Sequence, residues 1–221
     1  MEISIRPKMR ETSSLLFVRE ISRRVLGEYS EAISALDRAA DSAADLESVG
    51  AIIAARNRLR ACAEAHRALQ APAEAGPQDL GDHLGRLGAR LTAAELEPRG
   101  IRLKVVSQRV RLSAEQCWHV GLIVAELVRN ASRHGLAGRP GQIHLDIAER
   151  CGRVRCTVRD DGQLDFTQCL GRGRRLVQAM AARLGGRVRW AFTPLGCSAR
   201  LEFPAAPPEV STVAGPAGEI S

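Results

Sequence analysis

Apolar side chains recur every three or four residues in two long segments near the start of the chain, which is the spacing of an α-helix. The first segment covers about residues 13–36, and the second covers about residues 46–69. Either Ser42 or Asp45 could cap the second helix at its N-terminus, and Pro72 would end it. The short link between the two segments predicts an antiparallel helical hairpin.

The apolar stripe of such a hairpin cannot be buried by the hairpin alone. Pairing with a second hairpin in a four-helix bundle would bury it. We therefore expect residues 13–72 to form a dimerisation domain and the protein to be a homodimer. The alternative is that both helices pack against the rest of the same chain.

After a polar break between Pro72 and Gly81, with Asp79 as a helix cap, the pattern switches repeatedly between the period of a helix and the alternation of a strand. It predicts helices over about residues 80–96, 113–134 and 174–184, and strands over about residues 101–106, 142–148, 153–159, 188–192 and 198–203. This order predicts an α+β fold in which residues 79–204 form a two-layer α/β sandwich. The Pro- and Gly-containing residues 205–221 are expected to be a disordered tail.

Composition limits the classes of function. The chain has 221 residues, and its 32 basic and 25 acidic side chains give a net charge of +7. This charge favours polyanionic partners, but the arginines are spread over every segment without helix-turn-helix or zinc-finger spacing, so nucleic acid is not expected as the main partner. The six cysteines contain no C-x-x-C pair, which indicates reduced thiols. The sequence has no secretory signal and no apolar window that could span a membrane, so we expect a cytoplasmic protein without a membrane partner.

Glu126 and Asn130 lie four residues apart in an otherwise apolar predicted helix, so their side chains share one face. A carboxamide oxygen suits Mg²⁺, which takes hard oxygen ligands and bridges phosphates, and a carboxylate could orient or deprotonate a nucleophile. Arg133 and His134 at the same end of the helix could meet phosphate oxygens. Taken alone, the pattern is also that of the solvated side of a surface helix.

Two further motifs follow. Asp160 to Gly162 come directly after the predicted strand 153–159, where a buried carboxylate could accept the exocyclic amine of adenine and the glycine would let the base approach the backbone. Asp-Asp-Gly is equally a good hairpin turn. Gly171 and Gly173 open the next predicted helix, where free backbone N–H groups and the helix dipole favour phosphate.

In this order, the three motifs resemble those of the ATP-binding catalytic domain of sensor histidine kinases, within the GHKL ATPase superfamily. Glu126 to His134 resemble the family's N box, Asp160 to Gly162 its first glycine box, and Gly171 to Gly173 its second. Gly196-Cys197-Ser198 resembles the Gly-Gly-Thr element near the adenine. The helical hairpin is similar to the dimerisation hairpin of the subgroup with a His-Arg motif in its first helix.

The resemblance implies ATP and Mg²⁺ as cofactors and phosphoryl transfer in two-component signalling. It implies Glu126 as the catalytic base and Asn130 as the magnesium ligand. The implied ATP-binding residues are Asn130, Arg133, His134, Asp160, Gly162, Gly171, Gly173 and Ser198. The implied protein partner is a response regulator receiver domain or a partner kinase.

The chain departs from the pattern in its first helix and at the lid. Arg23 stands where this subgroup carries its phosphoacceptor histidine. A guanidinium stays protonated and is a poor nucleophile, so self-phosphorylation at the usual position is predicted to be absent. His66 is the histidine expected to be exposed beside the bundle. The first glycine box lacks its second glycine and the lid over residues 163–170 is short, which predicts weak ATP binding or a vestigial site.

Three functions remain open from the sequence. The protein could be a histidine kinase that passes phosphate to a response regulator. It could be a degenerate relative that acts as a dimerising scaffold or regulator of a kinase or response regulator. It could also be a kinase that phosphorylates a partner's side chain directly.

Overall fold

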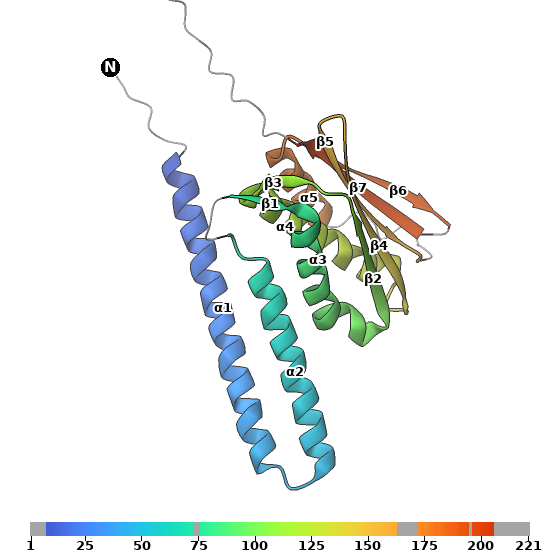
Figure 1. The fold of residues 1–221 in the computed structure, drawn as a ribbon. Coiled ribbons are helices and arrows are strands. Elements are labelled where there is room, and N and C mark those ends of the chain that lie inside the picture. Colours follow the sequence, from blue (N-terminus) through green and yellow to red (C-terminus); the bar gives the residue numbers. More distant parts are fainter. Residues whose placement is uncertain (1–7, 73–75, 163–171, 195, 206–221) are drawn as a thin grey trace, which may run out of the picture.

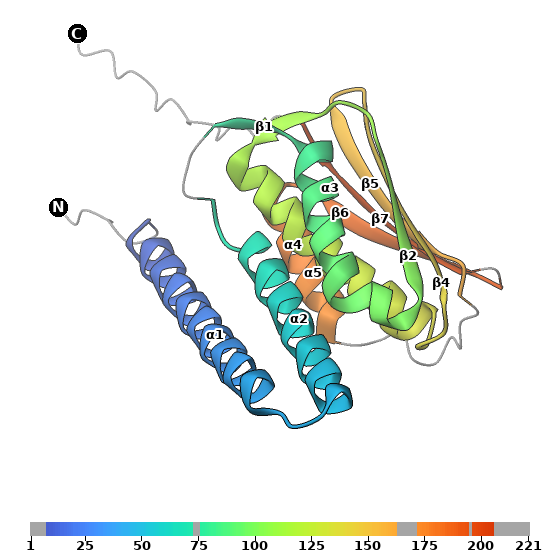
Figure 2. The same cartoon turned by 60° about the horizontal axis from the view of Figure 1, so that its bottom comes forward.

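The protein is built as successive layers of helix and sheet (Figure 1). The computed structural model describes residues 8–72, 76–162, 172–194 and 196–205. A first helix packs on a second, the second packs on a layer of three helices, and this layer covers one face of a five-stranded sheet. Figure 2 shows the same order from another side. The other face of the sheet is turned away from the helices.

The predicted hairpin is formed by α1 (Lys8–Ser42) and α2 (Leu46–Ala68). α1 extends beyond the periodic segment 13–36 at both ends, so the apolar period marks only the central part of the helix. Asp45 caps α2 by accepting a hydrogen bond of 2.7 Å from the backbone N–H of Ser48. Of the two predicted caps, Asp45 is therefore the one used.

α2 joins the hairpin to the rest of the chain. Its Ala63 and Ala65 are each 3% exposed, and Ala65 belongs to the main hydrophobic core. At the end of the helix, Trp118 Nε1 donates a hydrogen bond of 2.9 Å to the carbonyl of Leu69. The alternative to the bundle, packing against the rest of the same chain, thus holds for α2.

The sheet has the strand order β2-β4-β5-β7-β6. Its strands are β2 (Ile101–Ser107), β4 (Gly141–Arg150), β5 (Arg153–Asp160), β6 (Arg187–Thr193) and β7 (Gly196–Pro204). β2 runs parallel to β4, and the other neighbours are antiparallel. The predicted α+β fold with a two-layer sandwich is confirmed.

Three helices cover the inner face of the sheet: α3 (Leu80–Leu91), α4 (Ala114–Asn130) and α5 (Arg172–Arg183). The predicted cap Asp79 accepts a hydrogen bond from the N–H of Asp82, and Ser113 forms a capping box with Gln116. A π-helical turn continues α3 over Thr92–Leu96, a 3₁₀ turn covers Glu97–Arg99, and a second π-helical turn, η3, continues α4 over Ala131–Gly135.

A small second sheet was not predicted. It pairs β1 (Pro77–Asp79) with β3 (Arg111–Ser113) in antiparallel fashion. Each strand has three residues, which is too short for an alternating pattern to emerge from the sequence.

The hydrophobic core lies between the sheet and its helices. It is built from aliphatic side chains with Phe203 as its largest fully buried member. Two cysteines, Cys117 and Cys156, lie in this core, and burial raises the pKa of their thiols to about 11 and about 12. Among the described residues, no helix combines the length and apolar character that crossing a bilayer requires. The expected disordered tail over 205–221 lies almost entirely outside these residues.

Candidate functional site

The C-terminal end of α4 carries the first part of the site. Glu126 and Asn130 are both half-buried there, on the side of α4 that faces the start of α5. A Cβ atom built on Gly173 would lie 2.7 Å from Glu126 Oε1 and 3.6 Å from Asn130 Nδ2. The first turn of α5 therefore rests directly against the carboxylate and the carboxamide. Glycine at position 173 allows this approach.

Asp160 forms the second part, at the end of β5. Its side chain is nearly buried, with a relative exposure of 8%. Oδ1 accepts hydrogen bonds from the backbone N–H groups of Gly162 at 3.1 Å and Cys197 at 3.3 Å. Burial raises the pKa of the Asp160 carboxyl above its usual value, while these two N–H donors oppose the rise by stabilising the charged form. Among the described residues, no hydrogen bond to Oδ2 is present.

Three glycines close around Asp160. A Cβ on Gly135 would lie 2.5 Å from the carboxyl atoms of Asp160. A Cβ on Gly162 would overlap the carbonyl of Gly135, and one on Gly196 would overlap the carbonyl of Asp160. Gly135 ends η3, so this single turn connects Asn130 with the surroundings of Asp160. The structure thus places Glu126 and Asn130 of the predicted N box in one cluster, and Gly135, the residue directly after the box, in the neighbouring one.

The remaining predicted site residues do not all lie next to these two clusters. Arg133 and His134 are exposed on η3, between the two clusters. Ser198 lies opposite the exposed Arg159 in the β5–β7 register, on the face of the sheet that the helices do not cover. Its neighbour Cys197 contacts Asp160 instead, through its backbone N–H. Ser198 is therefore not brought into contact with Asp160.

Gly171 and the short lid over 163–170 lie outside the described residues.

Two polar contacts that sequence reasoning missed hold the end of α4. Arg129 pairs with Glu95, with Nη2 2.8 Å and Nε 3.0 Å from Oε1. Arg99 Nη1 donates a hydrogen bond of 3.0 Å to Oγ of Ser132, whose side chain is 1% exposed. A buried hydroxyl needs such a partner, and the bond fixes η3 against the turn that follows α3. Both pairs are more than thirty residues apart in sequence, so no local pattern announces them.

The chemistry of the donor set fits a nucleotide-held magnesium ion better than a protein cage. Among the described residues, no group of three or more His, Cys, Asp or Glu side chains could hold a metal ion. Asn130 offers one amide oxygen. Mg²⁺ usually keeps several waters and takes one or two protein ligands together with phosphate oxygens, which a single amide oxygen can satisfy.

Arg23, which stands at the position where the resemblance predicts a phosphoacceptor histidine, lies on the described part of α1. Arg23 is exposed there, and its Nη2 lies 2.7 Å from Oε1 of Glu20. Hydrogen bonds from Arg23 and Arg24 lower the pKa of Glu20 to about 2. The expectation of an exposed His66 is wrong: the side chain is half-buried, its ring centroid lies 6.5 Å from that of Tyr29, and Nε2 is buried without a partner among the described residues.

The mixed sheet with helices on one face matches the fold of a GHKL-type α/β domain. Residues 91–187 match the family of the histidine kinase-like ATPase domain. This part of the chain is accordingly a histidine kinase-like ATPase domain, and the chain as a whole resembles the sensor histidine kinases.

The similar proteins agree with this assignment. Blue-light-activated histidine kinase 2 of Erythrobacter litoralis (strain HTCC2594) is 27% identical over 133 residues, which cover 57% of this chain and 38% of that protein. The chain thus spans well under half of this curated relative.

Solved structures share the fold. The histidine kinase domain of the blue-light activated kinase from Erythrobacter litoralis EL346 superposes with a TM-score of 0.55 at 22% identity, covering 80% of this chain and 96% of that domain. Acinetobacter baumannii histidine kinase AdeS gives a TM-score of 0.51 at 13% identity over 83% of this chain and 95% of that one. Both matches extend beyond the ATPase domain into the helical hairpin.

Proposed function

We propose that the protein is a histidine kinase-like, Mg-ATP-binding component of two-component signalling. The observation that carries this proposal is the contact of Gly173 with Glu126 and Asn130, one turn away from the buried carboxylate of Asp160. A phosphate-binding helix start and an adenine-binding carboxylate must lie at such neighbouring positions to hold one nucleotide.

Each residue of the site has a distinct proposed role. Asp160 accepts the exocyclic amine of adenine through Oδ2, since both of its protein hydrogen bonds fall on Oδ1. The backbone N–H groups at the start of α5, around Gly173, face the phosphates together with the positive end of the helix dipole. Asn130 holds the magnesium ion, which would neutralise the charge of the phosphate oxygens. Glu126 orients or deprotonates the attacking nucleophile.

Arg133 adds positive charge next to the phosphates, and His134 offers a ring N–H group to the phosphate oxygens. Their exposure on η3 leaves both side chains free to reach toward the start of α5. Ser198 faces the other side of the sheet, so we now assign the contact with the adenine end to Cys197 in its place.

Titration calorimetry with Mg-ATP tests this site. We expect binding in the micromolar-to-millimolar range, about −8 to −4 kcal/mol. Asp160→Ala and Asn130→Ala should each weaken it. Asn57→Ala is the matched control, because Asn57 is exposed on α2, an element that contributes no residue to the site. Equal binding by all four proteins would contradict the assignment.

We further propose that the protein does not phosphorylate itself at the usual position in the first helix. Arg23 occupies that position with its guanidinium paired to Glu20. With γ-labelled ATP, we expect no acid-labile phosphate on any peptide of α1. Label on such a peptide would contradict the proposal. Label on an added receiver domain or other protein, with none on this chain, would identify a kinase that acts on a partner.

The alternative is a degenerate relative that serves as a dimerising scaffold or regulator, and one observation favours it. Asp160 is 8% exposed and already accepts two backbone hydrogen bonds, so the folded chain needs no nucleotide to satisfy it. Absence of calorimetric binding at millimolar Mg-ATP would select this alternative. The hairpin and its protein partners would then carry the function.

A further inference from the structure

The uncovered face of the five-stranded sheet is strongly basic. Alternation along each strand places every second side chain on this face, and the strand register sets these side chains next to one another. Nine exposed cationic residues occupy its outward positions: Arg102, Lys104, Arg150, Arg153, Arg155, Arg159, Arg187, Arg189 and Arg200. In the sequence these residues are scattered, which hides the cluster that the sheet creates.

Carboxylates neutralise only a small part of this charge. The outward positions of the strands hold two acidic residues, Asp146 and Glu202. Arg159 pairs with Asp146 at 2.6 Å, and Arg155 pairs with Glu202 at 2.9 Å. The other seven cations have no carboxylate partner among the described residues. The nine cations and two carboxylates leave this face with seven more positive than negative charges. This excess equals the net charge of +7 of the entire chain.

Two cross-strand pairs place arginine directly opposite arginine. Arg189 on β6 faces Arg200 on β7, and Arg150 on β4 faces Arg153 on β5. Like charges opposite each other in a sheet are destabilising, so these pairs lower the stability of the isolated fold. A bound polyanion would remove the repulsion. The arrangement therefore fits a face that works in contact with an anionic surface.

The side chains on the face indicate which anionic surface this is. Protein interfaces are centred on aromatic and aliphatic anchors, whereas the largest apolar side chain on this face is Val106. The aromatic residues of β6, Trp190 and Phe192, point the other way, where Arg174 of α5 stacks over them at 4.4 and 5.2 Å. The face thus offers no platform on which unpaired bases could stack.

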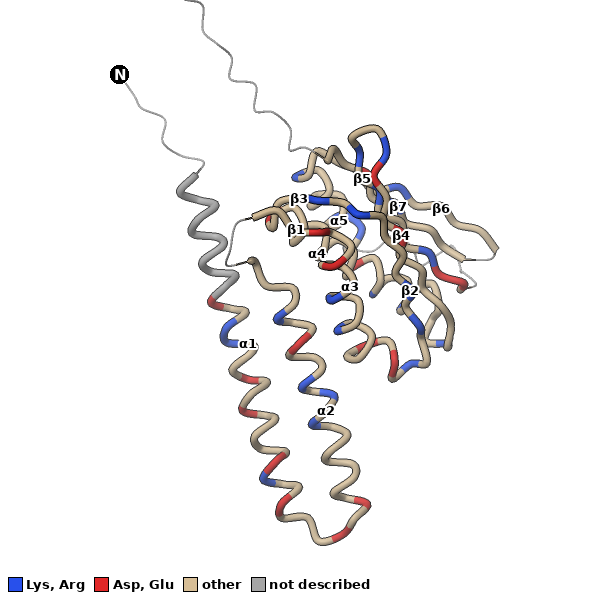
Figure 3. Tube along the Cα trace, in the orientation of Figure 1, with Lys and Arg blue, Asp and Glu red and all other residues tan. Residues whose placement is uncertain are grey.

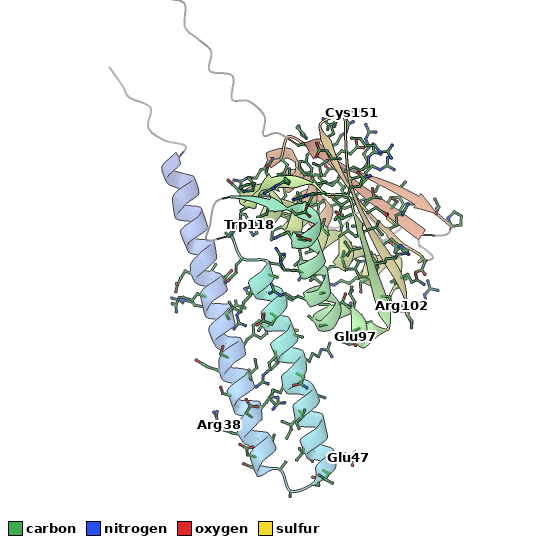
Figure 4. The ribbon with its side chains drawn as sticks, in the orientation of Figure 1. Arg38, Glu47, Glu97, Arg102, Trp118 and Cys151 are labelled. Atoms are coloured by element: carbon green, nitrogen blue, oxygen red, sulfur yellow. The ribbon has the colours of Figure 1, made fainter. Side chains whose placement is uncertain are left out.

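The distribution of the charges favours a broad surface over a groove. The cations extend across all five strands, about 19 Å at 4.8 Å per strand spacing, instead of following one line. In the part of the chain that the structure describes, no helix projects from this side to enter a nucleic-acid groove (Figures 1 and 3). Figure 4 marks Arg102 and Cys151, which lie at the lower and upper parts of the sheet side of the molecule.

We propose that the outer sheet face binds an anionic phospholipid membrane surface peripherally, without insertion. This goes beyond the proposed nucleotide site and does not depend on it. In this orientation the helices and the hairpin point away from the bilayer, so α1 remains accessible to a protein partner (Figure 2). The expectation of no membrane partner was based on the lack of a spanning segment, and a charged face requires none.

Vesicle co-sedimentation of the full chain tests the proposal. The probes are vesicles of phosphatidylcholine with about 30% phosphatidylglycerol and vesicles of phosphatidylcholine alone, at about 0.15 M salt. We expect binding to the anionic vesicles that weakens as salt is raised. In Arg153→Gln/Arg189→Gln/Arg200→Gln, binding should fall about fivefold per arginine, or about 100-fold in total.

A matched control separates the face from the net charge. Arg38→Gln/Arg58→Gln/Arg90→Gln removes the same charge from exposed positions on α1, α2 and α3 and should bind vesicles almost as the unchanged protein does. The sheet variant should also unfold at the same or a higher denaturant concentration, since the Arg189–Arg200 repulsion is gone.

The proposal is overturned by absence of binding to anionic vesicles, or by equal losses in the two triple variants. Tighter binding to a duplex DNA fragment or to polyglutamate than to the vesicles, at equal concentration of negative charge, would overturn the assignment to a membrane.

Discussion

At the scale of single residues, the surroundings of Asp160 act on its pKa in two opposite directions. Its burial favours the neutral carboxyl, and the N–H groups of Gly162 and Cys197 favour the carboxylate. Burial is the larger of the two effects, so the pKa of this carboxyl is raised in the folded protein. An adenine amine donated to Oδ2 would stabilise the charged form further.

The raised pKa of Asp160 predicts a pH dependence of stability. The folded protein keeps the proton on this carboxyl to a higher pH than the unfolded chain does, so this group's contribution to stability falls as pH rises through the folded-state pKa. In Asp160→Asn the group cannot ionise, and its amide oxygen can still accept both backbone bonds. We therefore expect denaturant unfolding to show the variant gaining stability relative to the unchanged protein as pH rises above about 4, the usual pKa of an aspartate. A difference that is constant with pH, or that changes in the opposite direction, would refute this.

Gly135 and Cys197 show what sequence reasoning could not find at this scale. Gly135 can lie against Asp160 because it has no side chain, and Cys197 donates a hydrogen bond to Asp160 from its backbone N–H. Neither kind of contact depends on a side chain that a motif would reveal. Asp160, Asn130 and Glu126 could be predicted as site residues because their proposed roles depend on their side chains.

At the scale of elements, the approach of α5 to α4 sets the geometry of the proposed nucleotide site. Gly173 is the contact point, and the neighbouring atom is the far end of the flexible Glu126 side chain. An added methyl group would therefore displace the carboxylate without breaking the fold.

This contact predicts a separation of binding from stability in Gly173→Ala. Thermal unfolding should be unchanged or slightly later, because alanine is favoured over glycine in a helix by about 0.5–1 kcal/mol. Mg-ATP affinity should fall about tenfold, or about 1.4 kcal/mol, by calorimetry. Gly85→Ala in α3, where an added methyl group meets nothing, is the control and should leave affinity intact. Unaltered affinity in Gly173→Ala would remove α5 from the site.

The elements themselves were largely predictable, and the exceptions have physical reasons. Asp79 was recognised as a cap because a cap depends on a few adjacent residues. β1 and β3 were missed because strands of three residues carry no period. The basic face was missed because a charge at every second position of separate strands becomes a cluster only once the strand register is known.

At the scale of the whole molecule, the hairpin extends from the ATPase domain with apolar residues still exposed. Of the five exposed large hydrophobic residues among those described, three lie on or at the start of its helices: Ile21, Leu46 and Ile53. α2 packs on α3, whereas α1 packs on α2 at the edge of the molecule (Figure 2). A second copy could cover this apolar surface in a four-helix bundle.

We predict a homodimer that depends on the hairpin. Sedimentation equilibrium should give twice the chain mass for the unchanged protein and a monomer for Ile21→Glu/Ile53→Glu, because two charges would be buried in the bundle. Val106→Glu on β2 is the control, since its exposure of 49% resembles the 46% of Ile21 while it lies on the sheet face. A monomeric unchanged protein, or a dimer that persists in the double variant, would contradict the prediction.

The central claim is that one nucleotide bridges Asp160 and the start of α5. Hydrogen–deuterium exchange with and without saturating Mg-ATP tests it most directly. The account predicts slower exchange at η3, at Gly162 and Cys197, and in the first turn of α5, with strand β2 unchanged. Exchange that is the same with and without Mg-ATP, or protection confined to other segments, would contradict it.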